Sequence, residues 1–209
     1  MIGLIKKDFL IIKSNLKLII AILFVFFIMA MQGQFDISFI PPFIVVMLFM
    51  STFSYDEYNK WDSYVVTLPN GRKNVVKSKY IASLILIVFA IIVTILLEFL
   101  VGLTGSSLDF DKFISTLMGS TFAIVLFASI MYPLIFKYGI EKGRIGLFVL
   151  VIGIVGIIGI FQKVFKVDVS LSIISFFNSY WFVTLPLVLI TILFISYKIS
   201  EKIYLKKEF

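Results

Sequence analysis

Covalent chemistry has very few candidate residues in this chain. Histidine and cysteine are absent from its 209 residues, which removes the commonest general base and metal ligand as well as every thiol nucleophile. Glu98, in the run ILLEFLVGL, is the one acidic residue well inside an apolar stretch. A serine–lysine dyad would need a lysine at similar depth, and no lysine meets that condition. We therefore predict no catalytic residue, no metal site and no enzymatic activity.

Glu98 is instead a candidate for a translocation path. A carboxylate at the centre of a bilayer costs about 2.5–3.5 kcal/mol, so such a residue is a functional hypothesis by default. It could line the path of a cationic molecule or form an ion pair with another membrane span. Its place near one end of the apolar run lowers the cost, and the residues alone leave both roles open.

A polar island between long apolar runs holds the second group of candidates. It covers residues 55–80 and reads YDEYNKWDSYVVTLPNGRKNVVKSKY. Residues spaced four, three and four apart share one face of a predicted helix there, namely Glu57, Trp61, Tyr64 and Leu68. The Pro-Asn-Gly sequence that follows ends the helix, because proline lacks an amide donor and Asn-Gly favours a turn. We predict a short helix across the base of a helical bundle, which either docks onto a partner or packs on its own bundle.

The N-terminus, residues 1–15, has an amphipathic pattern of its own. Its apolar residues step by four and three along one helical face, while the lysines project elsewhere; they are Ile5, Phe9 and Ile12, with Lys6 and Lys13. The pattern predicts an interfacial helix in the headgroup layer, with lysines that reach anionic lipid. The alternative is the basic flank of the first membrane span.

The apolar composition predicts that membrane-spanning helices position these candidate residues. The chain is 61% hydrophobic and only 15% charged, and runs of about 20 apolar residues indicate membrane spans. We predict an all-α integral membrane protein with a single domain over 1–209 and six transmembrane helices, at about 16–31, 39–54, 81–103, 113–136, 145–161 and 177–197. Close helix packing in the fifth span is predicted from three regularly spaced glycines: Gly153, Gly156 and Gly159.

Lysine and arginine placement predicts the topology. With both termini in the cytoplasm, all but three of the 19 basic residues lie on the inside, the exceptions being Lys112, Lys163 and Lys166. Positive loops are translocated poorly, so the polar island is expected on the cytoplasmic side. This asymmetry accounts for the net charge of +7, and no nucleic acid partner is expected.

A pattern of residue types runs through the polar island: Glu57-x-x-Lys60-Trp61-Asp62, then Leu68-Pro69, Arg72 and Ser78-Lys79-Tyr80. It resembles the first cytoplasmic loop of small six-span permeases of type-2 ABC (ABC-2) transporters. The most similar branch exports peptides or confers immunity to them, as in phenol-soluble-modulin exporters and bacitracin or lantibiotic immunity systems. The resemblance in span number and basic amphipathic start covers the whole chain, and the motif covers the island.

The resemblance implies a coupling helix that docks onto a separate ATP-binding subunit. The implied docking residues are Glu57, Lys60, Trp61, Asp62, Tyr64, Leu68, Pro69 and Arg72. The chain itself has no G-x-x-x-x-G-K-[ST] phosphate loop, so ATP and Mg are expected on the partner subunit and no cofactor on this chain. The other implied partners are a second permease (identical or a paralogue), membrane lipid and an amphipathic peptide substrate.

The expected function is therefore the permease subunit of an ATP-driven exporter in a bacterial plasma membrane. It would move amphipathic or antimicrobial peptides, or similar lipophilic molecules, out of the cell. The alternative is an ion-coupled secondary transporter, or a membrane scaffold with a cytoplasmic docking loop. An ion-coupled carrier usually has several intramembrane charges or broken helices at the midplane, and here Glu98 is the sole candidate of that kind.

Overall fold

The computed structural model describes residues 2–32, 38, 40–103, 110–146, 149 and 181–207. This part of the chain is helical and contains no strand, as predicted. Its helices are α1 (Ile2–Ser14), α2 (Leu16–Met31), α3 (Ile40–Tyr58), α4 (Trp61–Val65), α5 (Gly71–Leu103), α6 (Phe110–Tyr138) and α9 (Trp181–Lys206). Residues 140–146 are also helical.

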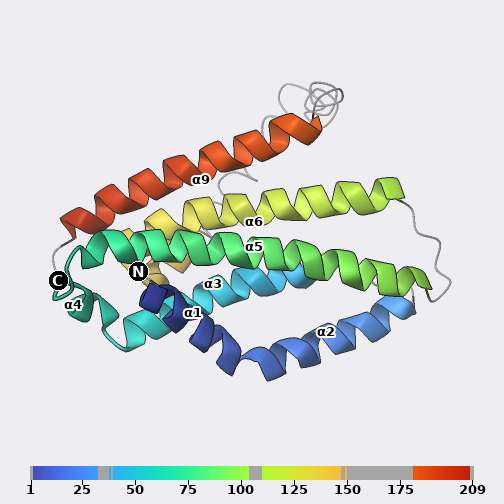
Figure 1. Ribbon diagram of the computed structural model, residues 1–209, viewed down its shortest axis with the longest axis horizontal. Coiled ribbons are helices and arrows are strands. Elements are labelled where there is room, and N and C mark those ends of the chain that lie inside the picture. Colours follow the sequence, from blue (N-terminus) through green and yellow to red (C-terminus); the bar gives the residue numbers. More distant parts are fainter. Residues whose placement is uncertain are drawn as a thin grey trace.

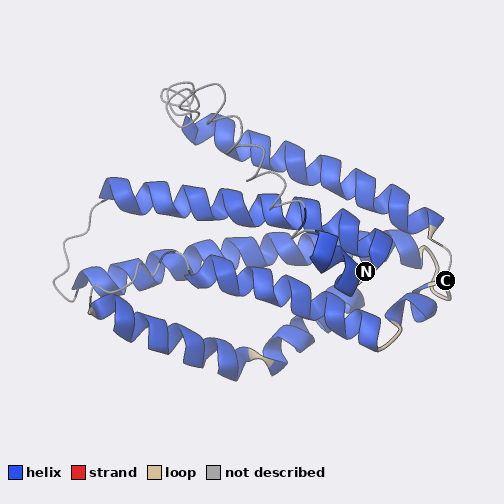
Figure 2. Ribbon diagram, turned by 180° about the vertical axis from the view of Figure 1, so that it is seen from behind, coloured by secondary structure: helices blue, strands red, loops and turns tan. Residues whose placement is uncertain are grey.

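The long helices lie side by side along one axis of the molecule. Helix α5 runs the length of the bundle beside α3 and α6, and α9 packs along α6 (Figure 1). Both ends of the chain lie at the same end of the bundle (Figure 1 and Figure 2). Helix α4 lies there too (Figure 1), and we call this end of the molecule the α4 end.

Two of the described helices are long and apolar enough to cross a membrane unaided, by length and composition: α5 and residues Phe113–Tyr138 of α6. A third candidate is the pair α1 and α2, which bends by 54° at its break. The predicted count of six spans remains a prediction. Most of the fifth predicted span, 145–161, and its three glycines lie outside the described residues.

Helix α3 packs inside the bundle with nine buried residues, while Phe43 and Met47 on it are exposed. Its buried side chains contact α5 and α6. Prolines 41 and 42 fall in its first turn, where no intrahelical amide bond is lost. Helix α3 therefore links the membrane-facing part of the bundle to the α4 end.

A column of aromatic rings fills the core from α3 toward the α4 end. The rings meet edge to face, the favoured arrangement of aromatic pairs. Phe53 lies 5.1 Å from Tyr132 and 5.4 Å from Phe136, and Phe136 lies 5.0 Å from Tyr204, between ring centroids. This contact chain joins α3, α6 and α9 directly beneath α4.

The polar island is more helical than predicted. Helix α3 continues to Tyr58 and α5 begins at Gly71, so only residues 59–70 lie between the two helices. Both helices thus extend into the polar island beyond the predicted span limits at 54 and 81, which themselves remain a prediction. The cause is burial: Val75, Val76 and Lys79 pack inside the bundle and hold the first turns of α5.

Candidate functional site

Helix α4 is bounded by two sharp bends. Lys60 precedes it with φ 49° and ψ 40°, and Asn70 ends the following turn with φ 53°. The left-handed conformation at Lys60 breaks the helix that the spacing from Glu57 to Leu68 had predicted as one continuous element, so that prediction is wrong. The predicted Pro-Asn-Gly turn is confirmed, since asparagine tolerates this conformation.

Gly71 is required where α5 begins. A Cβ atom at this position would lie 2.1 Å from the backbone oxygen of Val65. Its amide nitrogen donates to the carbonyl of Leu68 at 2.9 Å. The end of α4 is therefore packed directly on the start of α5.

Asp62 joins α4 to the end of α9. Its carboxylate accepts a hydrogen bond from the Tyr204 hydroxyl at 2.6 Å and pairs with the Lys207 ammonium at 3.0 Å. Burial, and next the hydrogen bond to Asp62, raise the pKa of Tyr204, so the phenol stays protonated and donates. Nearby, the Arg72 guanidinium donates to the carbonyl of Leu205 at 2.7 Å.

Glu57 joins the end of α3 to the segment after α6. Its carboxylate accepts a 2.5 Å hydrogen bond from the amide of Ile140, the start of a helical stretch where a negative charge is favourable. Gly139 ends α6 with φ +82°, and a Cβ atom there would lie 3.0 Å from the same carboxylate. Gly139 thus allows both the left-handed bend and the approach of Glu57.

The structure therefore separates the predicted docking residues into two groups. Glu57, Asp62 and Arg72 bind other helices of their own chain. Lys60, Tyr64 and Pro69 are exposed without such a contact being shown among the described residues, as are Tyr58 and Val66, which the spacing did not single out; Glu57 is exposed as well as bound. Tyr58 is 86% exposed and Tyr64 54% exposed.

Trp61 and Leu68 lie between these groups and are partly buried. The Trp61 ring lies 4.2 Å beneath the Lys7 ammonium and 5.0 Å from the Tyr64 ring. Its Nε1–H is buried and has no acceptor in the part of the chain that the structure describes.

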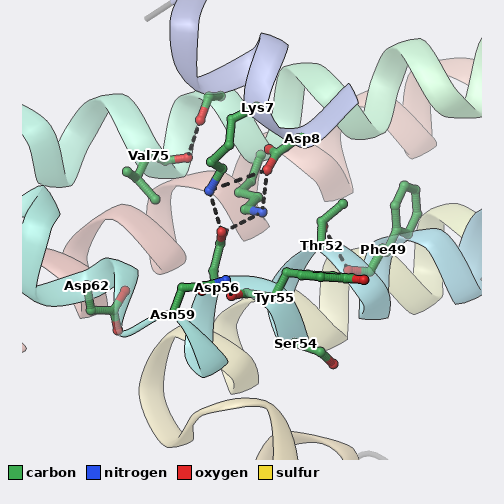
Figure 3. A network of polar contacts seen from close by, with 12 residues as sticks. Lys7, Asp8, Phe49, Thr52, Ser54, Tyr55, Asp56, Asn59, Asp62 and Val75 are labelled. Atoms are coloured by element: carbon green, nitrogen blue, oxygen red, sulfur yellow. Dashed lines mark hydrogen bonds and ion pairs between the residues drawn. The ribbon is translucent and has the colours of Figure 1, made fainter. Parts of the chain in front are cut away.

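A cluster of four charges, two of them buried, fastens α1 to the bundle, and residue spacing did not reveal it. It consists of Lys7, Asp8, Asp56 and Lys79, which we call the charge cluster. The Lys79 ammonium lies 2.9 Å from Asp8 and 2.7 Å from Asp56, and Lys7 pairs with both carboxylates. Figure 3 shows Lys7 directed between Asp8 and Asp56. The side chains of Lys79 and Asp8 are only 3% and 2% exposed.

The cluster changes the interpretation of α1. Ile12 is buried, Ile5 is half-buried and Phe9 packs against the core, whereas Lys6 and Lys13 are exposed. The apolar face of the predicted interfacial helix thus contacts protein, with Asp8 at its centre. The available signal was Asp8 itself, a lone acid in an otherwise apolar and basic segment.

A cavity of about 320 Å³ with both charged and apolar walls opens beside α4, between the ends of α3, α6 and α9. Its lining includes Trp61 and charges of both signs, which are Asp56, Glu57, Asp62, Lys79, Lys137 and Lys207. Among the described residues, no three His, Cys, Asp or Glu side chains group as a metal site. The arrangement suits the binding of a polar or charged side chain from a partner.

Glu98 lies far from this site along α5. Its carboxylate accepts a hydrogen bond from the buried Ser38 hydroxyl. This hydrogen bond offsets part of the free-energy cost of removing the Glu98 carboxylate from water. The role of Glu98 in translocation remains a prediction.

These features define an all-helical membrane protein whose long helices meet a short, exposed helix at one end. Residues 3–205 match the model of a family described as ABC-2 family transporter protein. The chain therefore belongs to the ABC-2 transporter family. Comparison with curated proteins and with solved structures found no match.

Proposed function

We propose that this chain is the permease subunit of an ATP-driven ABC exporter and that α4 is its coupling helix. The observation that carries the proposal is the construction of α4, which is braced by Asp62 and by the packing of Gly71 on Val65 while Tyr64 on α4 and Tyr58 at the end of α3 are exposed. Exposed tyrosines are frequent anchors of protein interfaces. A braced helix can pass a partner's displacement to the bundle as a rigid body.

A displacement of α4 by a partner is transmitted to other helices through the contacts that α4 makes with them. Movement of α4 acts on α9 through the Asp62–Tyr204 hydrogen bond and on α5 through the contact of Gly71 with Val65. Glu57, at the end of α3, links the neighbouring helix to the segment after α6. Helix α5 continues for 33 residues from this point, about 50 Å at 1.5 Å per residue, so a tilt at its start moves its far end.

The ATP-binding partner supplies ATP and Mg, and this chain supplies no catalytic group. The buried Trp61 Nε1–H and the mixed charges of the adjoining cavity support entry of a partner side chain that carries a hydrogen-bond acceptor. A second permease completes the transporter, as expected for the family. In this arrangement α4 faces the cytoplasm of a bacterial cell, and both termini share that side.

The proposed substrate is an amphipathic or antimicrobial peptide, or a similarly lipophilic molecule. Its support is the resemblance of the polar island to peptide-export and immunity permeases. Inside-out vesicles that contain the complex should take up such a peptide when ATP is supplied, including after a protonophore collapses the proton gradient. Uptake abolished by the protonophore at constant ATP would instead support an ion-coupled transporter.

The coupling assignment is tested by purifying the complex from its native membrane with Tyr58→Ala and Tyr64→Ala. We expect a soluble ATPase with a phosphate loop to co-purify with the wild type at near-equal ratio. The double variant should lose most of this partner, because it removes the two exposed anchors, whereas its own yield stays unchanged. The matched control is Phe99→Ala, an equally exposed aromatic residue on the far part of α5. Full retention of the ATPase by the double variant would overturn the assignment.

A further inference from the structure

A second, apolar groove lies between α5 and α9, away from α4. It encloses about 430 Å³. Its walls are Leu84 on α5 and Ile190, Leu193 and Phe194 on α9. Ile190 and Phe194 are 67% and 61% exposed. A groove of this kind in a membrane protein opens onto lipid chains.

The groove changes character along its length. The Lys77 side chain lines one end, one helical turn nearer the α4 end than Ile81. Tyr80 and Tyr197 pack edge to face at the same level, with ring centroids 5.5 Å apart. Lys198 is close by, with its ammonium 5.7 Å from the ring centroids of both Phe194 and Tyr197. The groove is thus basic and aromatic toward the α4 end and wholly apolar beyond it.

We propose that this groove binds one anionic phospholipid of the leaflet on the α4 side. An acyl chain lies along Leu84, Leu193 and Phe194, and the phosphate group lies at Lys77 within reach of Lys198. Tyr197, which is partly exposed at this boundary, matches the membrane interface, where one end of the ring is apolar and the other is wet. Basic pockets between membrane helices are suited to anionic headgroups.

Charge complementarity favours this lipid over a second copy of the chain. Lys77 is exposed and has no carboxylate among the residues that line the groove. Lys198 has Glu201 as a neighbour, at 3.8 Å, and the pair is open to solvent on the lysine side. A second copy would bring its own excess of basic residues toward Lys77, whereas a phosphodiester brings the missing negative charge. The groove depends on α5 and α9, and α4 takes no part in it.

The first test measures lipid retention on the full-length protein. Protein purified in mild detergent is incubated with phosphatidylglycerol or with phosphatidylcholine of the same chains, and native mass spectrometry counts the retained lipids. One lysine near an anionic headgroup contributes about a fivefold preference. We expect one retained phosphatidylglycerol per chain and a loss of about fivefold in Lys77→Gln. The matched control Lys73→Gln changes an exposed lysine one turn away on α5 that lies outside the groove.

Several results would overturn the proposal. Equal retention of the two lipids, or equal losses in Lys77→Gln and Lys73→Gln, would mean that the lipid follows surface charge alone. Leu84→Trp fills the groove while leaving Lys77 in place, so undiminished retention in this variant would place the lipid elsewhere. The natural chain has no cysteine, so a disulfide between two Leu193→Cys chains in membranes would assign the groove to a second copy.

Discussion

Replacement of Lys79 by methionine is expected to release α1 from the bundle. The Lys79 ammonium contacts two carboxylates, on α1 and α3, and methionine keeps most of the volume while removing the charge. Loss of one partner from a buried ion pair costs about 3–5 kcal/mol, because the remaining charge is left in a poor solvent. Lys7 stays 3.6 Å from Asp8 and offsets part of the loss, so we expect the lower value, about 3 kcal/mol.

Because the natural chain contains no cysteine, maleimide labelling of one introduced cysteine measures the opening of α1. Ile12 is 8% exposed on the inner face of α1, so a cysteine at this position reacts with a maleimide only when α1 opens. The labelling rate follows the population of the open form when opening and closing are fast. A loss of about 3 kcal/mol corresponds to labelling about 100-fold faster in Lys79→Met with Ile12→Cys than in Ile12→Cys alone.

Two further variants serve as the control and the rescue for Lys79→Met. Lys73→Met on the same background should leave the rate unchanged, because Lys73 is exposed. Adding Asp8→Asn to Lys79→Met should slow the labelling again, since it removes the stranded carboxylate and leaves Lys7 paired with Asp56. A rate in Lys79→Met within threefold of the background, or a further acceleration by Asp8→Asn, would refute the charge cluster as the fastening of α1.

Three other variants test contacts described above, each by the thermal midpoint of the purified protein. Tyr204→Phe removes a hydrogen bond to the Asp62 carboxylate, worth about 1.5 kcal/mol, and should lower the midpoint by about 3–6 °C; an unchanged midpoint would mean that α4 is not braced there. Gly71→Ala forces a Cβ against a backbone oxygen at 2.1 Å and should cost about 1–3 kcal/mol, with a matching loss of the ATPase partner. Ser38→Ala removes a donor from Glu98 and should cost about 1–3 kcal/mol, whereas a midpoint equal to the wild type would show that the contact adds nothing.

The elements that depend on local chemistry could be predicted from the sequence. The turn at Asn70 was predictable because its conformation is set by the residue and its neighbours. Helix α2, Leu16–Met31, follows an apolar run broken only by Lys17, and its limits coincide with those predicted for the first span. The break at Lys60 was not predictable in this way, because lysine has no preference for the left-handed conformation.

The contacts that organise the site depend on distant parts of the chain. Asp62 meets Tyr204, which is 142 residues away, and Glu57 meets Ile140, which is 83 residues away. Spacing within the polar island places both acids near α4, but it carries no information on whether their partners are intramolecular. The family resemblance implied a partner subunit for both, and the structure adds a contact of each acid within its own chain and the exposed side chains of Tyr58, Tyr64 and Val66 beside them.

A crosslink from the residue that directly follows α4 tests most directly whether α4 docks onto the ATP-binding subunit. Val66→Cys places a single cysteine at a position that is 49% exposed beside α4, and Val25→Cys places one at a 54% exposed position on α2. Each variant is treated in native membranes with a short maleimide–succinimide crosslinker. We expect a product with a phosphate-loop ATPase from position 66 and none from position 25. The absence of an ATPase product from position 66, in membranes that retain ATP-driven export, would rule out α4 as the coupling helix.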